Sequence, residues 1–121
     1  MNVSDYCREV AFVAIPVSDP QRSREFYERV LGFKVTAQWQ DDWIEFNIGA
    51  GTLALTKEDQ RHRAGQHGAT IGLEVSDFEG VLACVRAAGV TIKDGPWDSP
   101  ACFGCIIADP DGNELILHKK K

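Results

Sequence analysis

The chain has 121 residues, 44% of them hydrophobic, which suits one domain with its own core and is too many for a disordered chain. Its 18 acidic and 13 basic residues give a formal charge of −5, which argues against nucleic acid because phosphate contacts need clustered positive charge. The mostly apolar run 10–17 is far shorter than the roughly 20 residues of a membrane span, so we expect a soluble, cytoplasmic protein with no membrane partner.

The chain divides into two copies of one unit. The tripeptide Val-Ser-Asp at 17–19 recurs at 75–77, and each copy follows an apolar stretch and precedes an amphipathic one. Internal repetition of this kind is typical of a duplicated supersecondary unit. We therefore expect a single domain, 1–121, made of module one over about 9–57, a polar linker over about 58–68 and module two over about 69–119.

Module one opens with a strand at 12–17 and continues with a helix at 20–31. Asp19 is a good N-cap, Pro20 suits the first helical position, and Gly32 suits a left-handed residue after the last turn. Three β-like runs follow, at 34–39, 43–48 and 52–56.

Module two repeats this order. A strand is predicted at 70–75 and a helix at 78–88, between Asp77 and Gly89. Three further β-like runs follow, at 91–97, 101–108 and 114–118, and the residue types at 109–112 indicate a turn between the last two. The predicted fold is α+β, with the unit βαβββ present twice.

Side chains alternate between the two faces of a strand, so each sheet has a helix face, covered by its helix, and an open face opposite. The helix faces take plainly apolar series such as Val13, Ile15 and Val17. The open faces mix aromatic, small and polar residues, among them Phe12, Trp43, Glu45, Asn47, Ala54, Thr70, Glu74, Glu114, Ile116 and His118. Two such faces that curve together predict a ligand cleft.

Two segments resemble a known family: Val13 to Phe33, which includes Val17-Ser18-Asp19-Pro20, and Asp109-Pro110-Asp111-Gly112-Asn113-Glu114. They are similar to the vicinal oxygen chelate superfamily, which includes glyoxalase I, bleomycin-resistance proteins, fosfomycin-resistance enzymes and extradiol dioxygenases. The resemblance covers nearly the whole chain. It implies tandem βαβββ modules that form a cupped mixed sheet with helices on the outer face, and it implies a homodimer. It leaves the activity open, because activity varies across the superfamily.

Enzymes of that superfamily usually hold a divalent metal at four strand positions, typically with His or Gln, Glu, His and Glu. The corresponding positions here are Phe12, Ala54, Thr70 and Ile116. Hydrocarbon side chains have no lone pair, and one Thr hydroxyl does not replace imidazole and carboxylate donors. We therefore expect no metal at these positions and no cofactor.

A rearranged site stays open as an alternative. Glu74, Glu114 and His118 share a face by parity and are the candidates for acid–base catalysis or for a displaced divalent metal such as Zn, Ni, Mn or Fe. Cys102 and Cys105 have the spacing of a redox pair, but residues three apart on a strand point to opposite faces. We place Cys105 on the cleft side, together with Phe103.

The aromatic residues favour ligand binding. Phe12 and Trp43 fall on the open face, while Trp39 and Trp97 line either the cleft or an interface. The preferred hypothesis is a metal-independent homodimer that resembles bleomycin-resistance proteins and binds a small aromatic or cationic organic ligand in an aromatic-lined cleft. The alternatives are a glyoxalase-like lyase, isomerase or dioxygenase with a rearranged metal site, and a module whose cleft is filled by its own side chains. The expected ligand-binding residues are Phe12, Trp43, Glu45, Asn47, Thr70, Trp97, Phe103, Cys105 and Ile116.

Overall fold

The computed structural model describes residues 2–7, 9–60, 62–65 and 70–121, and it contains the predicted tandem βαβββ fold. Part of the predicted linker and the predicted start of module two, residues 61 and 66–69, lie outside the described residues. A short 3-10 helix, η1 (Val3–Asp5), precedes module one. Module one then holds β1 (Val13–Val17), α1 (Pro20–Glu25), η2 (Phe26–Val30), β2 (Lys34–Trp39), β3 (Trp43–Ile48) and β4 (Gly51–Lys57). Module two holds β5 (Ile71–Glu74), α2 (Phe78–Ala87), β6 (Ile92–Asp98), β7 (Cys102–Ala108) and β8 (Glu114–Lys120).

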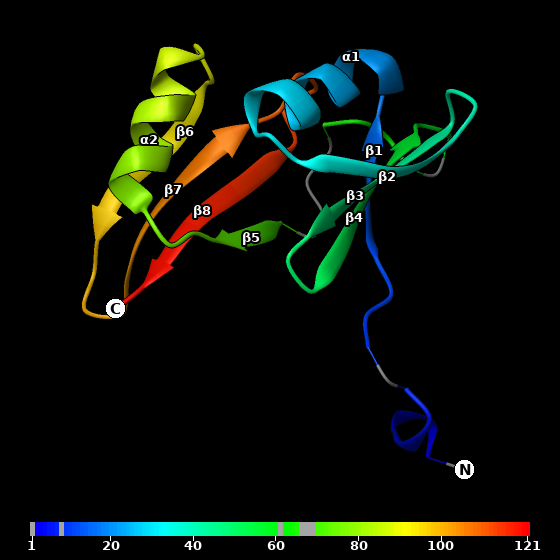
Figure 1. Cartoon of the computed structure of the whole chain (residues 1–121), viewed down its shortest axis with the longest axis horizontal. Helices are drawn as coiled ribbons and strands as arrows, with labels where there is room; N and C mark the ends of the chain where they lie inside the picture. The colour runs from blue at the N-terminus through cyan, green and yellow to red at the C-terminus, as the bar shows by residue number, and fades with distance from the viewer. Residues whose placement is uncertain (1, 8, 61, 66–69) are drawn as a thin grey trace.

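Each module forms its own four-stranded mixed sheet. The strand order is β1-β4-β3-β2 in module one and β5-β8-β7-β6 in module two. In both sheets the first pair, β1 with β4 and β5 with β8, is parallel, and the other pairs are antiparallel. A parallel pair needs a long crossover connection, which the helix and the intervening strands of each module supply. The two modules lie beside each other, and both helices lie at the end remote from the N-terminus (Figure 1).

The first helix changes geometry halfway along. Its predicted cap is confirmed, because the Asp19 carboxylate accepts a hydrogen bond from the Arg22 N–H at 3.2 Å. From Phe26 the helix widens into the π-helical segment η2, and the Leu31 N–H bonds to the Phe26 carbonyl at 3.1 Å. A π-turn changes the angle between neighbouring side chains, and here both Phe26 and Tyr27 are buried.

The helix faces of both sheets share one hydrophobic core. Ile15, Val17 and Phe46 enter it from the first sheet, and Leu115 and Leu117 enter it from the second. Because each open face lies opposite a helix face, both open faces point away from this core. The expected cleft between the two open faces is therefore not formed across this core, because both faces lie on its outside.

The turn between β7 and β8 ties the two modules together. The buried Asp109 carboxylate accepts hydrogen bonds from the Tyr27 hydroxyl and the Asn113 side-chain amide, each at 2.9 Å. The same amide donates to the carbonyl of Pro16 at 3.0 Å. Asp111 bonds to Ser18 and pairs with Arg22 at 2.9 Å. The predicted turn is thus also the main polar contact of module two with β1 and α1.

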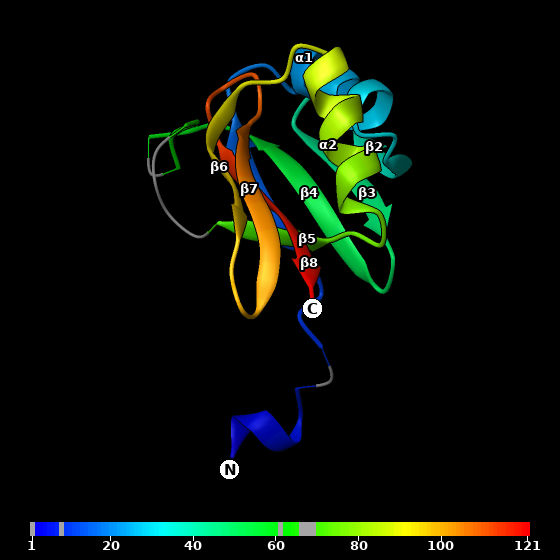
Figure 2. The same ribbon diagram turned by 90° about the vertical axis from the view of Figure 1, so that its left-hand side faces the viewer.

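An arm formed by residues 2–7 and 9–12 extends from the body of the molecule in both views (Figures 1 and 2). Tyr6 is 72% exposed and Val10 is 75% exposed on this arm. The arm leads directly into β1, which lies at the edge of its sheet. Across the described ranges, the helices are too short or too polar to traverse a lipid bilayer.

Candidate functional site

The open face of the first sheet carries an exposed aromatic group, which we call the aromatic corner and define as Phe12, Trp39, Trp43 and Glu45. The rings of Phe12 and Trp43 meet edge to face, with centroids 5.2 Å apart and an interplanar angle of 85°. Trp39 lies opposite Trp43 in the β2–β3 register, so both side chains share this face. The indole N–H of Trp43 donates to the Glu45 carboxylate at 2.8 Å.

Strand register explains why these rings meet. Ala14, Ala54 and Glu45 form one row across β1, β4 and β3. Phe12 and Trp43 lie on either side of this row, and their rings close above it. Ala54 is therefore fully buried although it belongs to the open face. Phe12 and Trp39 nevertheless remain 48% and 59% exposed, so the corner still offers ring surface to a ligand.

The positions that carry metal ligands in similar enzymes do not fit a metal. Ala54 is fully buried in the row between Phe12 and Trp43, and Ile116 lies between Gly72 and Ile106 in the second sheet. Phe12 offers only an aromatic ring, and Thr70 is exposed just before β5. Among the residues that the structure describes, no group of three His, Cys, Asp or Glu side chains is arranged to hold an ion.

The second open face brings together part of the predicted acid–base group. The His118 Nδ1 and the Glu74 Oε1 are 2.5 Å apart, and the Lys120 backbone N–H donates to the other Glu74 oxygen at 2.7 Å. The Lys120 N–H and the His118 imidazole lower the pKa of Glu74, and the hydrogen bond to Glu74 raises the pKa of His118. His118 is half-exposed and Glu74 is exposed, and His118 lies toward the C-terminal end of β8.

The other two carboxylates do not join this pair. Glu114 lies at the opposite end of β8, where the Lys93 ammonium group is 2.8 Å from its carboxylate. Glu45 belongs to the aromatic corner of the other sheet. Of the candidates Glu74 and Glu114, only Glu74 therefore reaches the His118 imidazole.

The predicted faces of β7 are reversed. Cys105 pairs with Leu117 in register and is fully buried in the core, so it lies on the helix face. Phe103 also lies there and stacks on Phe78 of α2, with centroids 6.1 Å apart. The placement of Phe103 and Cys105 in a cleft on the open face is wrong, because the turn pairs Ala108 with Glu114 and thereby fixes the parity of the whole strand.

The other predicted ligand residues lie on open faces but are scattered. Asn47 is exposed at the far end of β3, and Ile116 is half-buried in the middle of β8. Trp97 lies opposite Gly104, and its indole covers that glycine: a Cβ built on Gly104 would lie 2.4 Å from the ring. Trp97 therefore belongs to the second open face, and the aromatic corner belongs to the first.

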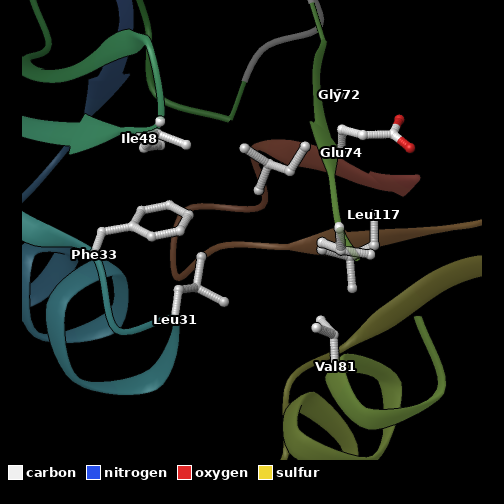
Figure 3. Close-up of a pocket in the computed structure, with 10 residues that line it drawn as sticks. Leu31, Phe33, Ile48, Gly72, Glu74, Val81 and Leu117 are labelled. Atoms are coloured by element: carbon white, nitrogen blue, oxygen red, sulfur yellow. The ribbon is translucent and has the colours of Figure 1, made fainter. Parts of the chain in front are cut away.

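A cavity of about 440 Å³ lies elsewhere, between the two modules on the helix-face side. Its lining residues are Leu31, Phe33, Ile48, Gly49, Gly72, Leu73, Glu74, Val75, Val81 and Leu117. Figure 3 shows Leu31, Phe33 and Ile48 facing Val81 and Leu117, while the Glu74 carboxylate points away. The cavity has the size of a small-molecule site but lacks the convergent polar groups that orient a ligand. Sequence patterns give no sign of it because it forms only where the modules meet.

The whole chain was also compared with known proteins. The family model for the Glyoxalase/Bleomycin resistance protein/Dioxygenase superfamily matches residues 9–117. None of the curated proteins matches the chain significantly.

Several solved structures share the fold. One is TnmS3, an antibiotic binding protein from Streptomyces sp. CB03234, with 24% identity, a TM-score of 0.83 and coverage of 95% of this chain and 98% of that chain. A glyoxalase/bleomycin resistance protein from the same Streptomyces strain has 24% identity, a TM-score of 0.75 and coverage of 93% and 100%. Lactoylglutathione lyase from Agrobacterium tumefaciens has 17% identity, a TM-score of 0.74 and coverage of 93% and 94%.

Proposed function

Because this chain belongs to the glyoxalase/bleomycin resistance protein/dioxygenase superfamily, we propose that it acts there as a metal-independent binding protein for a small organic molecule. The ligand is planar and cationic, and it stacks on the aromatic corner of the first open face. The observation that carries this proposal is the edge-to-face contact of the exposed Phe12 with the half-buried Trp43, beside the Glu45 carboxylate.

The chemistry of the corner suits such a ligand. Exposed rings offer stacking and cation–π contacts worth about 0.5–2 kcal/mol each. The Glu45 carboxylate fixes the Trp43 indole and places negative charge next to it. The formal charge of −5 on the chain attracts cations over a longer range.

Two further observations support binding rather than metal-dependent catalysis. The positions that hold metal ligands in similar enzymes are Phe12, Ala54, Thr70 and Ile116, which lack the necessary donors. One protein of the same fold is described as an antibiotic binding protein. Binding without chemistry is therefore compatible with this scaffold.

The binding unit that we propose is a homodimer. The two open faces of one chain diverge from a shared core, so a ligand on the aromatic corner is covered only if another copy supplies the opposite wall. The arm exposes Tyr6 and Val10, and it precedes β1, an edge strand of the first sheet. Light scattering should report a mass of two chains, and Val10→Asp should shift it toward one.

Binding is tested with chelator-treated protein and a panel of planar aromatic cations and their neutral analogues. We expect cations to raise the melting temperature more than the neutral analogues do. Trp43→Ala should weaken the affinity at least about fivefold, because it removes a stacking surface of that order. Val81→Trp, which fills the cavity between the modules, serves as the matched control and should leave the affinity unchanged.

The opposite pattern of results would contradict the proposal. Loss of binding in Val81→Trp with full binding in Trp43→Ala would move the ligand to the cavity. A strict requirement for added Zn, Ni, Mn or Fe would favour the lyase, isomerase or dioxygenase alternative instead.

A further inference from the structure

We infer that Cys102, His118 and Glu74 on the second open face form a nucleophilic thiol site that adds to electrophilic, α,β-unsaturated carbonyl compounds. This site lies on the other sheet from the aromatic corner, so the inference does not rest on the proposed function. It is based on the juxtaposition of three side chains from three strands: Cys102 in β7, His118 in β8 and Glu74 in β5.

The β7–β8 register places the thiol beside the imidazole. Gly104 pairs with His118, and Cys102 pairs with Lys120, so Cys102 and His118 are diagonal neighbours on the open face. Diagonal neighbours in an antiparallel pair are close enough for long side chains to touch. Gly104 has no side chain, and the Trp97 indole covers it.

Glu74 orients the imidazole. Its carboxylate is 2.5 Å from the His118 Nδ1, and its other oxygen is held by the Lys120 backbone N–H at 2.7 Å. A carboxylate on Nδ1 fixes the proton on that nitrogen in the neutral ring and leaves the second nitrogen available as an acceptor. The thiol is therefore the nucleophile, the imidazole is its base, and the carboxylate orients the base.

The surroundings of the thiol favour its ionised form. The Ser99 hydroxyl lies 3.6 Å from the Cys102 sulfur. Hydrogen bonding with the Ser99 and Trp97 side chains, together with the neighbouring His118, lowers the pKa of Cys102. The charged groups at this end of the sheet are Glu74, Lys119, Lys120 and the Lys121–Asp98 pair, and the site remains partly open to solvent.

The addition step balances within these three residues and the substrate. The Cys102 thiol gives its proton to His118, and the sulfur forms a bond to the β-carbon of the unsaturated carbonyl compound. The carbon–carbon π pair moves to the α-carbon, which takes the proton from His118. The product is a thioether, the imidazole returns to its neutral form, and no oxidant or reductant is needed.

The chain carries its own controls for a test with acrylamide, an α,β-unsaturated amide. Cys7 and Cys84 are exposed, Cys102 is half-buried and Cys105 is buried. Peptide mass spectrometry of one sample measures the labelling rate of all four cysteines between pH 5.5 and pH 9. At pH 6.5 we expect Cys102 to react at least about tenfold faster than Cys84, despite its lower exposure, because the thiolate is the nucleophile.

Substitutions then distinguish the effect of a base on the Cys102 labelling rate from the effect of solvent exposure. His118→Gln should bring the rate of Cys102 down to that of Cys84 and move its pH profile upward, and Glu74→Gln should give an intermediate rate. The rate of Cys84 should stay the same in both variants. Cys105 should remain unlabelled in both, which verifies that they are folded.

The wild-type protein alone can overturn the inference. A Cys102 rate at pH 6.5 no higher than that of Cys84 would exclude an activated thiol, whatever the variants do. A Cys102 rate that is unchanged in a folded His118→Gln variant would exclude His118 as the base. Neither result bears on cation binding at Trp43, so the two proposals fail independently.

Discussion

The Tyr27 hydroxyl is the clearest case in which one polar atom connects two modules. It donates to Asp109, which is only 5% exposed and also accepts hydrogen bonds from the backbone N–H groups of Asp111 and Asn113. Burial and the neighbouring Asp109 carboxylate raise the pKa of Tyr27, so the hydroxyl keeps its proton throughout the range in which the protein is handled. The Tyr27 hydroxyl therefore stays a hydrogen-bond donor to the buried Asp109 carboxylate.

Tyr27→Phe should lower the free energy of unfolding by about 1.5–3 kcal/mol, the usual cost of removing a hydrogen bond to a charged group. Urea denaturation measures this loss. Tyr6→Phe is the control, because Tyr6 is 72% exposed on the arm and should change stability by less than about 0.5 kcal/mol. Equal losses in the two variants would mean that the Tyr27–Asp109 contact contributes nothing specific.

At the scale of elements, hydrophobic alternation was sufficient for most strands and failed for one. In β3 and β8 the apolar positions Ile44, Phe46, Leu115 and Leu117 alternate with a series that includes polar residues, and their faces follow from this contrast. In β7 both alternating series are apolar or small, so composition does not distinguish them. The pairing of Ala108 with Glu114 across the turn would have settled the parity, because one fixed pair sets the face of every residue in a hairpin.

Because the two faces of β7 were exchanged in the sequence prediction, Cys102 was not predicted to lie next to His118. Once Gly104 is placed opposite His118, Cys102 falls on the open face and Cys105 in the core. Burial also raises the pKa of Cys105, so that thiol is the less reactive of the two. The geometry of the cavity and the π-helical segment had no signal in the sequence at all, because both depend on packing between elements.

Glycine positions in the second sheet give a test of element packing. A Cβ on Gly104 would lie 2.4 Å from the Trp97 ring, whereas a Cβ on Gly72 has no neighbour within 4 Å. Gly104→Ala should displace the indole, change the tryptophan fluorescence and cost about 1–3 kcal/mol of stability. Gly72→Ala, in the neighbouring strand β5, should be neutral or slightly stabilising. A neutral Gly104→Ala with unchanged fluorescence would contradict the close packing of Trp97.

At the scale of the whole molecule, the two modules depend on each other. Their helix faces bury one common core, and the Asp109–Asn113 turn bonds to β1 and α1. The sequence repeat predicted the two modules, but it did not predict that their open faces diverge. Divergence follows from which faces the modules bury against each other, and the strand patterns are the same for either arrangement.

Asp111→Ala should therefore weaken the whole domain rather than one module. It removes acceptors from Ser18 and Arg22, and we expect a loss of about 1–3 kcal/mol in a single cooperative unfolding transition. Glu28→Ala is the matched control: it also removes one carboxylate paired with an arginine, but the partly exposed Arg24–Glu28 pair is local to the adjoining segments α1 and η2 of module one. Its loss should stay below about 0.5 kcal/mol. Two separate transitions in the wild-type protein would contradict this dependence.

The most direct measurement of where a ligand binds uses nuclear magnetic resonance on chelator-treated protein. The three tryptophans each give an indole N–H signal, which Trp→Phe variants assign, and the leucine and valine methyl groups report on the cavity. Titration with a planar cation should shift the Trp43 indole signal in a saturable way and leave the Leu31 and Val81 methyl signals in place. Methyl shifts at Leu31 and Val81 with a stationary Trp43 signal would show that the aromatic corner is not the binding surface.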